Sequence, residues 1–527
     1  MFMVSAMQLH AGSAQQLIRD ACRLAPAQRP LIIVGGPKYI YEPWDAFGVD
    51  PADPWGADVA VTGEEYVVLS LIETLLEARR PGESMRAAFA RARDSGALDG
   101  IPGLVYPRGS TPLVAEELVD TGVQRLVADL DELPDPVLGY RLLEPPSRAE
   151  TLGPRALPDD QIRRLSPIGS LTLTFGCKFA CPYCPIPAYN QRQHRAKSGA
   201  RIAEEMTRLY DTFRLRYHFG SDDNFFNSTE RTLDIVETLA KTQIDGAPIR
   251  KRIRWGTEVT VHDTLRLRDH LPDVRLAGVR SLWLGVEDMT ATLVKKGQSV
   301  DKTSEAFRLL QQNGISPMPM MMHHDEQPLI SRGPRPYGLL NQVRLLRKAG
   351  AVSMQVLMLV PATGSKLFGG TYTSGMAYDS VGGRKVEEHM LGGNYVIASN
   401  HPKPWRKQIN IWLAYMYFYN PLRFLVALVR PKSKLYLVDA MWQGLGMWGL
   451  AETIRRTFTW TFRLRFGKIV RKSAPPMNRI PMRAPNGAGA DHALIDDVIA
   501  EGVASGSLPI LAEDARPGHK RLQVLSK

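Results

Sequence analysis

Three of the four cysteines in this chain, Cys177, Cys181 and Cys184, lie within eight positions of one another. Thiolates bind soft metals, and a closed structural zinc site generally takes four ligands. The fourth cysteine, Cys22, is far away in a helical pattern that is typical of a small core residue. Three thiolates on one short loop suit a cubane iron–sulfur cluster with one iron open to an amine and a carboxylate. A zinc knuckle is the alternative.

The elements around these cysteines form a regular pattern. Helical segments such as 200–214, 229–241 and 303–313 alternate with apolar strands at 171–175, 216–220, 253–258, 281–286, 315–322 and 353–360. Six such repeats predict an α/β fold, specifically a partial (βα)6 TIM-like barrel over 166–368. Working groups in such barrels sit at the carboxyl ends of the strands, and Cys177 directly follows the first strand.

The CxxxCxxC spacing, with Tyr183 before the last cysteine, resembles the signature of the radical S-adenosylmethionine (SAM) enzymes. The resemblance implies that Cys177, Cys181 and Cys184 bind a 4Fe-4S cluster and that the methionine part of SAM chelates the open iron. One electron would then cleave the sulfonium and release a 5′-deoxyadenosyl radical, which abstracts hydrogen from carbon. An electron donor such as flavodoxin or ferredoxin is implied as well.

Further segments agree with this resemblance over 166–368. "YHFGSDDNFF" ends the second strand, where the family has polar groups near the amino end of SAM, so Ser221, Asp222 and Asp223 are expected cofactor contacts, together with Tyr183. "LWLGVEDM" resembles the family's G-x-E segment and would place Glu287 near the ribose. "GISPMPMM" and "LVPATGSKLF" resemble the strand beside the adenine and the last-strand element.

Two pairs of residues near these strand ends receive no catalytic assignment. Lys295 and Lys296 lie on the turn after the fourth strand. His323 and His324 replace the Gly/Pro turn that the family usually has after the fifth strand. A ligand or proton-relay role and a plain polar loop are both open for the histidines, because neighbouring residues of a strand point to opposite sides.

Residues 1–80 have βαβ patterning and resemble the second half of the cobalamin-binding domain found before many radical SAM enzymes, so we expect a truncated Rossmann-like domain. If cobalamin binds, Gly35, Gly36 and Gly63 are the expected contacts, because glycine lets the backbone approach a flat ligand. His10 is not assigned to cobalt. Either the native protein starts earlier or the domain has lost cobalamin; an uncovered apolar edge strand favours the former.

The composition is that of a globular protein of two or three domains, with 44% hydrophobic and 23% charged residues in 527. Four cysteines and the lack of a secretory signal predict a reducing, cytoplasmic location. The net charge of +12 is concentrated late in the chain, since 401–480 has 15 Lys and Arg against 2 Asp and Glu. Such a region indicates an anionic partner.

The other predicted regions are a connector at 81–165, a helical, basic and aromatic-rich region at 369–473, and a flexible tail with a short helix at 474–527. No stretch reaches the ~20 apolar residues of a spanning helix. The 401–480 segment has the composition of an interfacial anchor, which would place the protein peripherally at the inner membrane face. An equally weighted alternative is that this segment forms ordinary core helices that cover the barrel mouth. Nucleic acid is the least favoured of the possible anionic partners.

Three functions remain open on the sequence. The first is a radical SAM enzyme that transfers a methyl group, with cobalamin, to an unactivated carbon of a hydrophobic small molecule or lipid. The second is cobalamin-independent ring closure or carbon–carbon coupling. The third is a non-catalytic iron–sulfur or zinc protein that docks at membranes.

Overall fold

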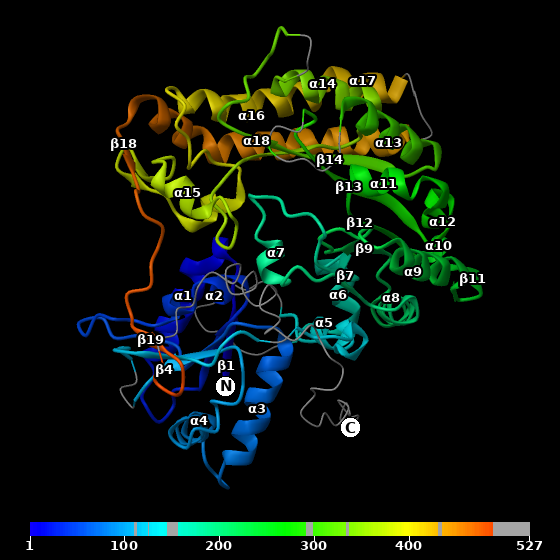
Figure 1. Cartoon of the computed structure of the whole chain (residues 1–527). Helices are drawn as coiled ribbons and strands as arrows, with labels where there is room; N and C mark the ends of the chain where they lie inside the picture. The colour runs from blue at the N-terminus through cyan, green and yellow to red at the C-terminus, as the bar shows by residue number, and fades with distance from the viewer. Residues whose placement is uncertain are drawn as a thin grey trace.

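The computed structural model describes residues 1–109, 113–124, 126–144, 156–290, 293, 299–333, 337–429 and 435–488. An N-terminal α/β sheet, a curled parallel half-barrel and a helical C-terminal region follow one another along these residues (Figure 1). The predicted fold class is confirmed. Lys295 and Lys296 lie outside the described residues. The tail is described only over 474–488, where the predicted short helix is not found. Residues 489–527 lie outside the described residues.

The half-barrel is a six-stranded sheet in the order β15-β14-β13-β12-β9-β6, with every neighbouring pair parallel. Because the spatial order follows the chain order, all carboxyl ends of the strands meet at one rim. The predicted strands match this sheet within a few residues. Its strands are β6 (Ile168–Leu171), β9 (Tyr217–Gly220), β12 (Arg254–Thr260), β13 (Val279–Glu287), β14 (Ser316–His323) and β15 (Gln355–Met358).

Helices cover the outer face of the half-barrel (Figure 1). Serine caps define where three of them begin, because the hydroxyls of Ser198, Ser228 and Ser299 accept backbone N–H groups of the first turns. Their apolar faces and the strands form the largest core cluster. These helices are α8 (Gly199–Phe213), α9 (Thr229–Lys241), α10 (Ile249–Arg252), α11 (Val261–Arg266), α12 (Leu271–Leu276), α13 (Val300–Gln312) and α14 (Leu339–Ala349).

The N-terminal sheet has six strands, in the order β1-β2-β3-β4-β5-β19. They are β1 (Phe2–Ser5), β2 (Ile32–Gly35), β3 (Val59–Val61), β4 (Leu104–Pro107), β5 (Leu118–Asp120) and β19 (Met482–Arg483), and the helices beside them are α1 (Ala11–Cys22), α2 (Pro37–Tyr41), α3 (Glu65–Ala78) and α4 (Met85–Asp94). Two strands therefore come from the segment predicted as a connector, and one comes from the predicted tail. β1 is an edge strand, as the sequence pattern indicates.

Shorter elements precede the half-barrel or lie between its strands. They are α5 (Pro136–Tyr140), α6 (Asp159–Leu165), β7 (Thr174–Phe175), α7 (Ile186–Tyr189), β8 (Arg195–Ala196) and the hairpin of β10 (Gln243–Ile244) and β11 (Ala247–Pro248). β7 pairs with β8, so the cysteine segment between them is the loop of a small antiparallel ribbon.

The C-terminal region packs on the open edge of the half-barrel. Tyr415 lies on α16 (Pro404–Phe418), and Tyr419 directly follows this helix. The Tyr415 hydroxyl donates to the Val356 carbonyl and the Tyr419 hydroxyl to the Met354 carbonyl, so the two side chains cover the edge strand β15. α15 (Phe368–Thr373) precedes α16, while α17 (Pro421–Val429) and α18 (Tyr436–Phe466) follow it. A small antiparallel sheet, absent from the prediction, contains β16 (Tyr378–Val381), β17 (Arg384–Lys385) and β18 (Ile469–Arg471).

Candidate functional site

The cysteine loop, residues 176–185, follows β7, a few residues beyond the carboxyl end of β6, the first strand of the half-barrel. Cys181 is buried, whereas Cys177 and Cys184 are partly exposed, and none of the three forms a disulfide. The amide of Cys184 donates to the carbonyl of Cys181 at 3.0 Å, which closes a tight turn. The loop thus presents its thiols at the rim where the sequence predicts them.

The backbone of the cysteine loop is anchored from three sides. Gly176 has φ +90°, and a Cβ there would lie 1.9 Å from the Gln193 carbonyl oxygen, so only glycine fits. The Lys178 amide donates to the Asn227 side chain at 2.8 Å. The Leu367 amide donates to the Pro182 carbonyl at 2.9 Å, from beyond the last strand of the half-barrel. A loop held in this way is preorganised to hold a ligand.

The acidic pair after β9 supports the loop directly. Asp222 is buried, and its carboxylate accepts the amides of Leu173 and Thr174 and the hydroxyl of Thr257. Burial raises its pKa to about 6. Asp223 accepts the Gly176 amide at 2.7 Å, and burial raises its pKa also. Both contacts are structural for the loop, while contact with SAM remains a prediction.

Ser221 lies beside this pair, and its hydroxyl is 2.8 Å from that of Ser170 on β6. Ser221 is exposed, so its hydroxyl is open to a ligand at the rim.

Tyr183 and Glu287, both predicted as cofactor contacts, lie in one electrostatic group with Glu258, which the sequence analysis did not identify. The pKa of Tyr183 is raised, mainly by burial and then by the Glu287 carboxylate and the thiols of Cys181 and Cys184. Glu258, within β12, has its pKa raised to about 7 by burial and by the carboxylates of Asp222, Asp223 and Glu287. An acidic residue inside the predicted strand "RWGTEVT" was the available signal for Glu258.

These carboxylates gather negative charge near the cysteine loop. SAM carries a positively charged sulfonium and ammonium group, and nearby opposite charge stabilises the ionised carboxylate. Glu287 itself has φ +55°, a conformation that costs energy for a non-glycine residue and that clusters at functional sites. The charge and the backbone at this rim therefore fit a cationic cofactor.

The chemistry of the thiols fits an iron–sulfur cluster better than a single metal ion. Within the part of the chain that the structure describes, no three His, Cys, Asp or Glu side chains converge as ligands of one ion. In a cubane cluster each thiolate binds a different iron, so the three sulfur atoms need not converge on one point. Cys177, Cys181 and Cys184 are the residues that would hold it.

The N-terminal sheet meets the segment that follows the cysteines. Arg195 donates to both carboxylate oxygens of Glu64, at 2.6 and 2.8 Å, and both side chains are buried. Gln191 donates to the carbonyl of Gln124 at 3.0 Å, and the Tyr41 hydroxyl donates to the Pro185 carbonyl at 2.9 Å. The carboxyl edge of β2 and β3 therefore faces the cysteine loop.

The three glycines predicted to contact cobalamin lie at this same edge. A Cβ on Gly36 would be 2.6 Å from the Ser5 hydroxyl, and one on Gly63 would be 2.4 Å from the Gln124 side chain. Gly35 has only ordinary contacts. Packing within the chain thus explains Gly36 and Gly63 without a cofactor, and cobalamin contact at all three stays a prediction.

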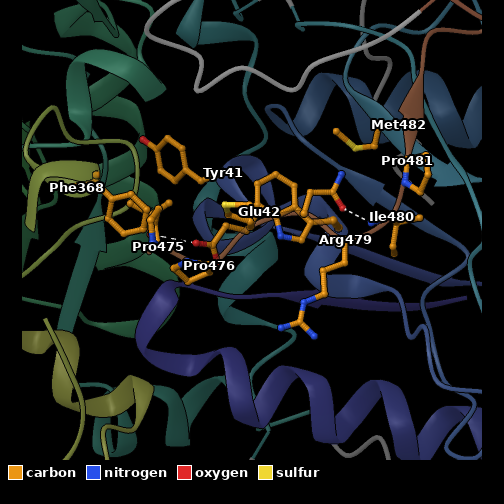
Figure 2. Close-up of a pocket in the computed structure, with 14 residues that line it drawn as sticks. Tyr41, Glu42, Phe368, Pro475, Pro476, Arg479, Ile480, Pro481 and Met482 are labelled. Atoms are coloured by element: carbon orange, nitrogen blue, oxygen red, sulfur yellow. Dashed lines mark hydrogen bonds between the residues drawn. The ribbon is translucent and has the colours of Figure 1, made fainter. Parts of the chain in front are cut away.

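A cavity of about 510 Å³ opens next to this edge. Figure 2 shows Tyr41 and Phe368 on one side of it and Ile480, Pro481 and Met482 on the other. Its remaining lining is largely apolar, with the Glu42 carboxylate bound to the Thr363 hydroxyl at 3.3 Å. This volume lies in the range of small-molecule sites, and the lining comes from the segment after β2, the segment after β15 and residues 475–482.

The two histidines after β14 have different surroundings. His323 is fully buried between the side chains of Gln327 at 2.7 Å and Asn410 at 3.1 Å, and burial lowers its pKa to about 3. These contacts give it a structural role between β14 and α16. His324 is also buried, with an Nε2 that has no hydrogen-bond partner in the described residues, and burial lowers its pKa.

Comparison with known families agrees with this geometry. Residues 171–328 match the sequence profile of the Radical SAM superfamily, whose members use a 4Fe-4S cluster and SAM. The matched segment contains the cysteine loop, Ser221, the acidic pair and Glu287. The chain therefore carries a radical SAM domain.

Over most of its length the chain also shares the fold of a cobalamin-binding member of this class. The radical SAM methyltransferase TsrM from Kitasatospora setae, solved with cobalamin and a 4Fe-4S cluster bound, superposes with a TM-score of 0.53 and 15% identity. The alignment covers 87% of this chain and 88% of TsrM. The family match confirms the sequence-based recognition of a radical SAM domain, and the superposition confirms a fold shared with a structure in which cobalamin is bound.

Two curated relatives align with smaller parts of this chain. The anaerobic magnesium-protoporphyrin IX monomethyl ester cyclase of Rubrivivax gelatinosus is 24% identical over 27% of this chain and 24% of its own length. The hopanoid C-3 methylase of Methylococcus capsulatus is 25% identical over 40% of each chain. The chain thus spans between about a quarter and two fifths of the length of these relatives.

Proposed function

We propose that this chain is a radical SAM enzyme that transfers a methyl group, with cobalamin, to an unactivated carbon of a hydrophobic substrate. When bound, the cluster supplies the electron that activates SAM, and cobalamin supplies a methyl carrier. The observation that carries the proposal is the anchored loop of Cys177, Cys181 and Cys184, against which the carboxyl edge of the N-terminal sheet is packed.

Different residues of the site have different roles. The three thiols hold the cluster, and Gly176 and Asp223 fix the loop that carries them. The carboxylates of Glu258 and Glu287 attract the cationic groups of SAM. The cavity lined by Tyr41, the segment around Phe368 and 475–482 adjoins the junction of sheet and half-barrel, and it gives space for part of a large cofactor. An external one-electron donor is required.

A hydrophobic substrate, and within that class a lipid, is favoured by similarity to the Methylococcus capsulatus relative, which is named a hopanoid methylase. The second candidate is ring closure or carbon–carbon coupling without cobalamin, favoured by similarity to the Rubrivivax gelatinosus protein, which is named a cyclase. The packing that explains Gly36 and Gly63 without a cofactor also favours this candidate.

The test measures iron and cobalt in one anaerobic sample that has been reconstituted with iron, sulfide and hydroxocobalamin and then desalted. Four irons and about one cobalt per chain, with S-adenosylhomocysteine formed from SAM, support methyl transfer. Four irons without cobalt favour the second candidate. Cys181→Ala should lose iron and SAM cleavage together, whereas Cys22→Ala, outside the loop, should keep both; iron retained by Cys181→Ala contradicts the cluster assignment.

A further inference from the structure

The long helix α18 is apolar on two opposite sides. One side faces the protein interior with six buried residues, Ala440, Gln443, Thr457, Trp460, Thr461 and Leu464. The opposite side exposes Leu437, Met441, Leu445, Trp448, Phe458, Phe462 and Phe466. At 100° per residue these seven fall within one arc of about 140°, in two groups at 437–448 and 458–466, and exposed Arg455 lies on the same arc between the groups.

The neighbouring helix α17 adds further exposed apolar side chains. It packs on α18 and exposes Leu422, Leu425, Val426, Leu428 and Val429, of which Leu422 is 71% and Val429 76% exposed. We call these twelve residues of α17 and α18 the apolar face. Monomeric soluble proteins rarely expose large apolar patches, so twelve exposed apolar side chains on two helices that pack together indicate a docking site.

Positive charge accompanies the apolar face. Arg455 and Arg456 are exposed halfway along α18, and the two share one carboxylate, Glu452, at 2.7 and 2.6 Å. The chain between α17 and α18 reads Arg-Pro-Lys-Ser-Lys over 430–434 in the sequence. The region 401–480 as a whole has 15 basic against 2 acidic residues.

This combination suits a lipid surface better than a protein partner. The region 401–480 has 15 basic against 2 acidic residues, and helices that lie in a membrane interface combine such an excess of Lys and Arg with exposed Trp, Phe and Leu. None of the helices in the described residues combines the length and apolar content that a bilayer span requires, so α18 would lie along the surface. Figure 1 shows α16, α17 and α18 together at the end of the molecule remote from the N-terminal sheet.

We propose that the apolar face of α17 and α18, with its arginines, docks the protein on the surface of a bilayer that contains anionic lipid. Anionic headgroups meet Arg455 and Arg456, and the apolar face enters the boundary between headgroups and acyl chains. The proposal stands independently of the radical SAM chemistry, since no residue of the apolar face contributes to the cysteine loop.

The experiment is flotation of the full chain with vesicles of phosphatidylcholine, with and without phosphatidylglycerol, at low and high NaCl. We expect binding to the phosphatidylglycerol vesicles that weakens with salt. Trp448→Ala with Phe462→Ala should lower the partition constant by roughly tenfold or more, because both side chains are largely exposed and lose apolar contact with lipid. Arg455→Gln with Arg456→Gln should lower it by about tenfold, on phosphatidylglycerol only.

Leu142→Ala with Leu165→Ala is the matched control, because both leucines are exposed on other elements. It should bind as the wild type does, and all variants should keep the wild-type iron content. Absence of wild-type binding to phosphatidylglycerol at low salt overturns the proposal, as does unchanged binding by Trp448→Ala with Phe462→Ala. A wild-type dimer in the absence of lipid that the same variant converts to monomer also overturns it, because the apolar face would then join two copies.

Discussion

The Glu258 carboxylate lies among three others at the rim of the half-barrel, and its pKa is raised to about 7 by burial and by Asp222, Asp223 and Glu287. Above pH 7 it is ionised and attracts the cationic groups of SAM. We therefore expect SAM affinity to rise with pH through about 7. In Glu258→Gln this rise should disappear, and affinity at pH 8 should fall by about tenfold. Calorimetric titration of the reconstituted protein with SAM measures both effects.

The same substitution has a predictable effect on stability. A folded pKa above the ordinary value means that the wild type loses stability as the pH rises from about 4.5 to about 7. Glu258→Gln should therefore unfold at a higher temperature than the wild type at pH 8 and at nearly the same temperature at pH 4.5. Glu204→Gln, on the exposed side of α8, is the control and should change neither property. A pH-dependent SAM affinity in Glu258→Gln would show that another group is responsible.

At this scale the sequence predicts residues that share a short segment. The cysteines, Tyr183 and the acidic pair could be identified because each belongs to a local pattern of spacing. Glu258 had only its place inside a strand as a local signal, because the carboxylates that raise its pKa lie after β9 and at the end of β13, between about 30 and 36 positions away along the chain. The anchoring of Gly176 by Asp223 likewise depends on strand packing that no local pattern contains.

Among the elements, the strands of the half-barrel were predictable and the later strands of the N-terminal sheet were not. Long apolar runs such as β13 are buried on both faces and are separated by amphipathic helices, which is a strong local signal. By contrast, β4 and β5 are short, and a proline ends β4. β19 has two residues and depends on the Leu118 amide donating to the Pro481 carbonyl, about 360 positions away. Such pairing leaves no periodicity in the sequence.

The contact between β8 and the turn after β3 gives a prediction at the element scale. Arg195 and Glu64 form a buried, two-bond ion pair that joins the cysteine segment to the N-terminal sheet. Glu64→Gln should destabilise the protein by about 3 kcal/mol, because the buried guanidinium loses its charged partner. Arg195→Met should do the same, while the double variant should lose much less than the sum, as measured by urea unfolding in a double-mutant cycle.

The exposed pair of Arg141 and Asp159, 3.1 Å apart, is the matched control for this cycle. Its coupling energy should be below about 1 kcal/mol, because water screens both charges. A coupling energy as small for Arg195 and Glu64 would mean that this pair does not join the two sheets.

At the scale of the molecule, a late segment of the described chain returns to the N-terminal sheet. After β18 the segment 475–482 runs from the helical region to the N-terminal sheet, where β19 pairs with β5 (Figure 1). On the way it lines the cavity beside Tyr41 and Phe368 (Figure 2). The same segment therefore covers a sheet edge and closes one side of the cavity, so its attachment should affect both.

Ile480→Asp tests this attachment. Ile480 is 4% exposed and packs in the N-terminal core cluster, so a carboxylate there would be buried without a partner and the segment should detach. We expect faster hydrogen exchange at the Leu118 amide, which loses the Pro481 carbonyl, and unchanged exchange at Gly176 and Cys184 in the cysteine loop. Met477→Asp, 67% exposed on the same segment, should exchange as the wild type does. If the Leu118 amide exchanges as slowly in Ile480→Asp as in the wild type, β5 is held in place without β19. Residues other than 475–482 would then close this side of the cavity.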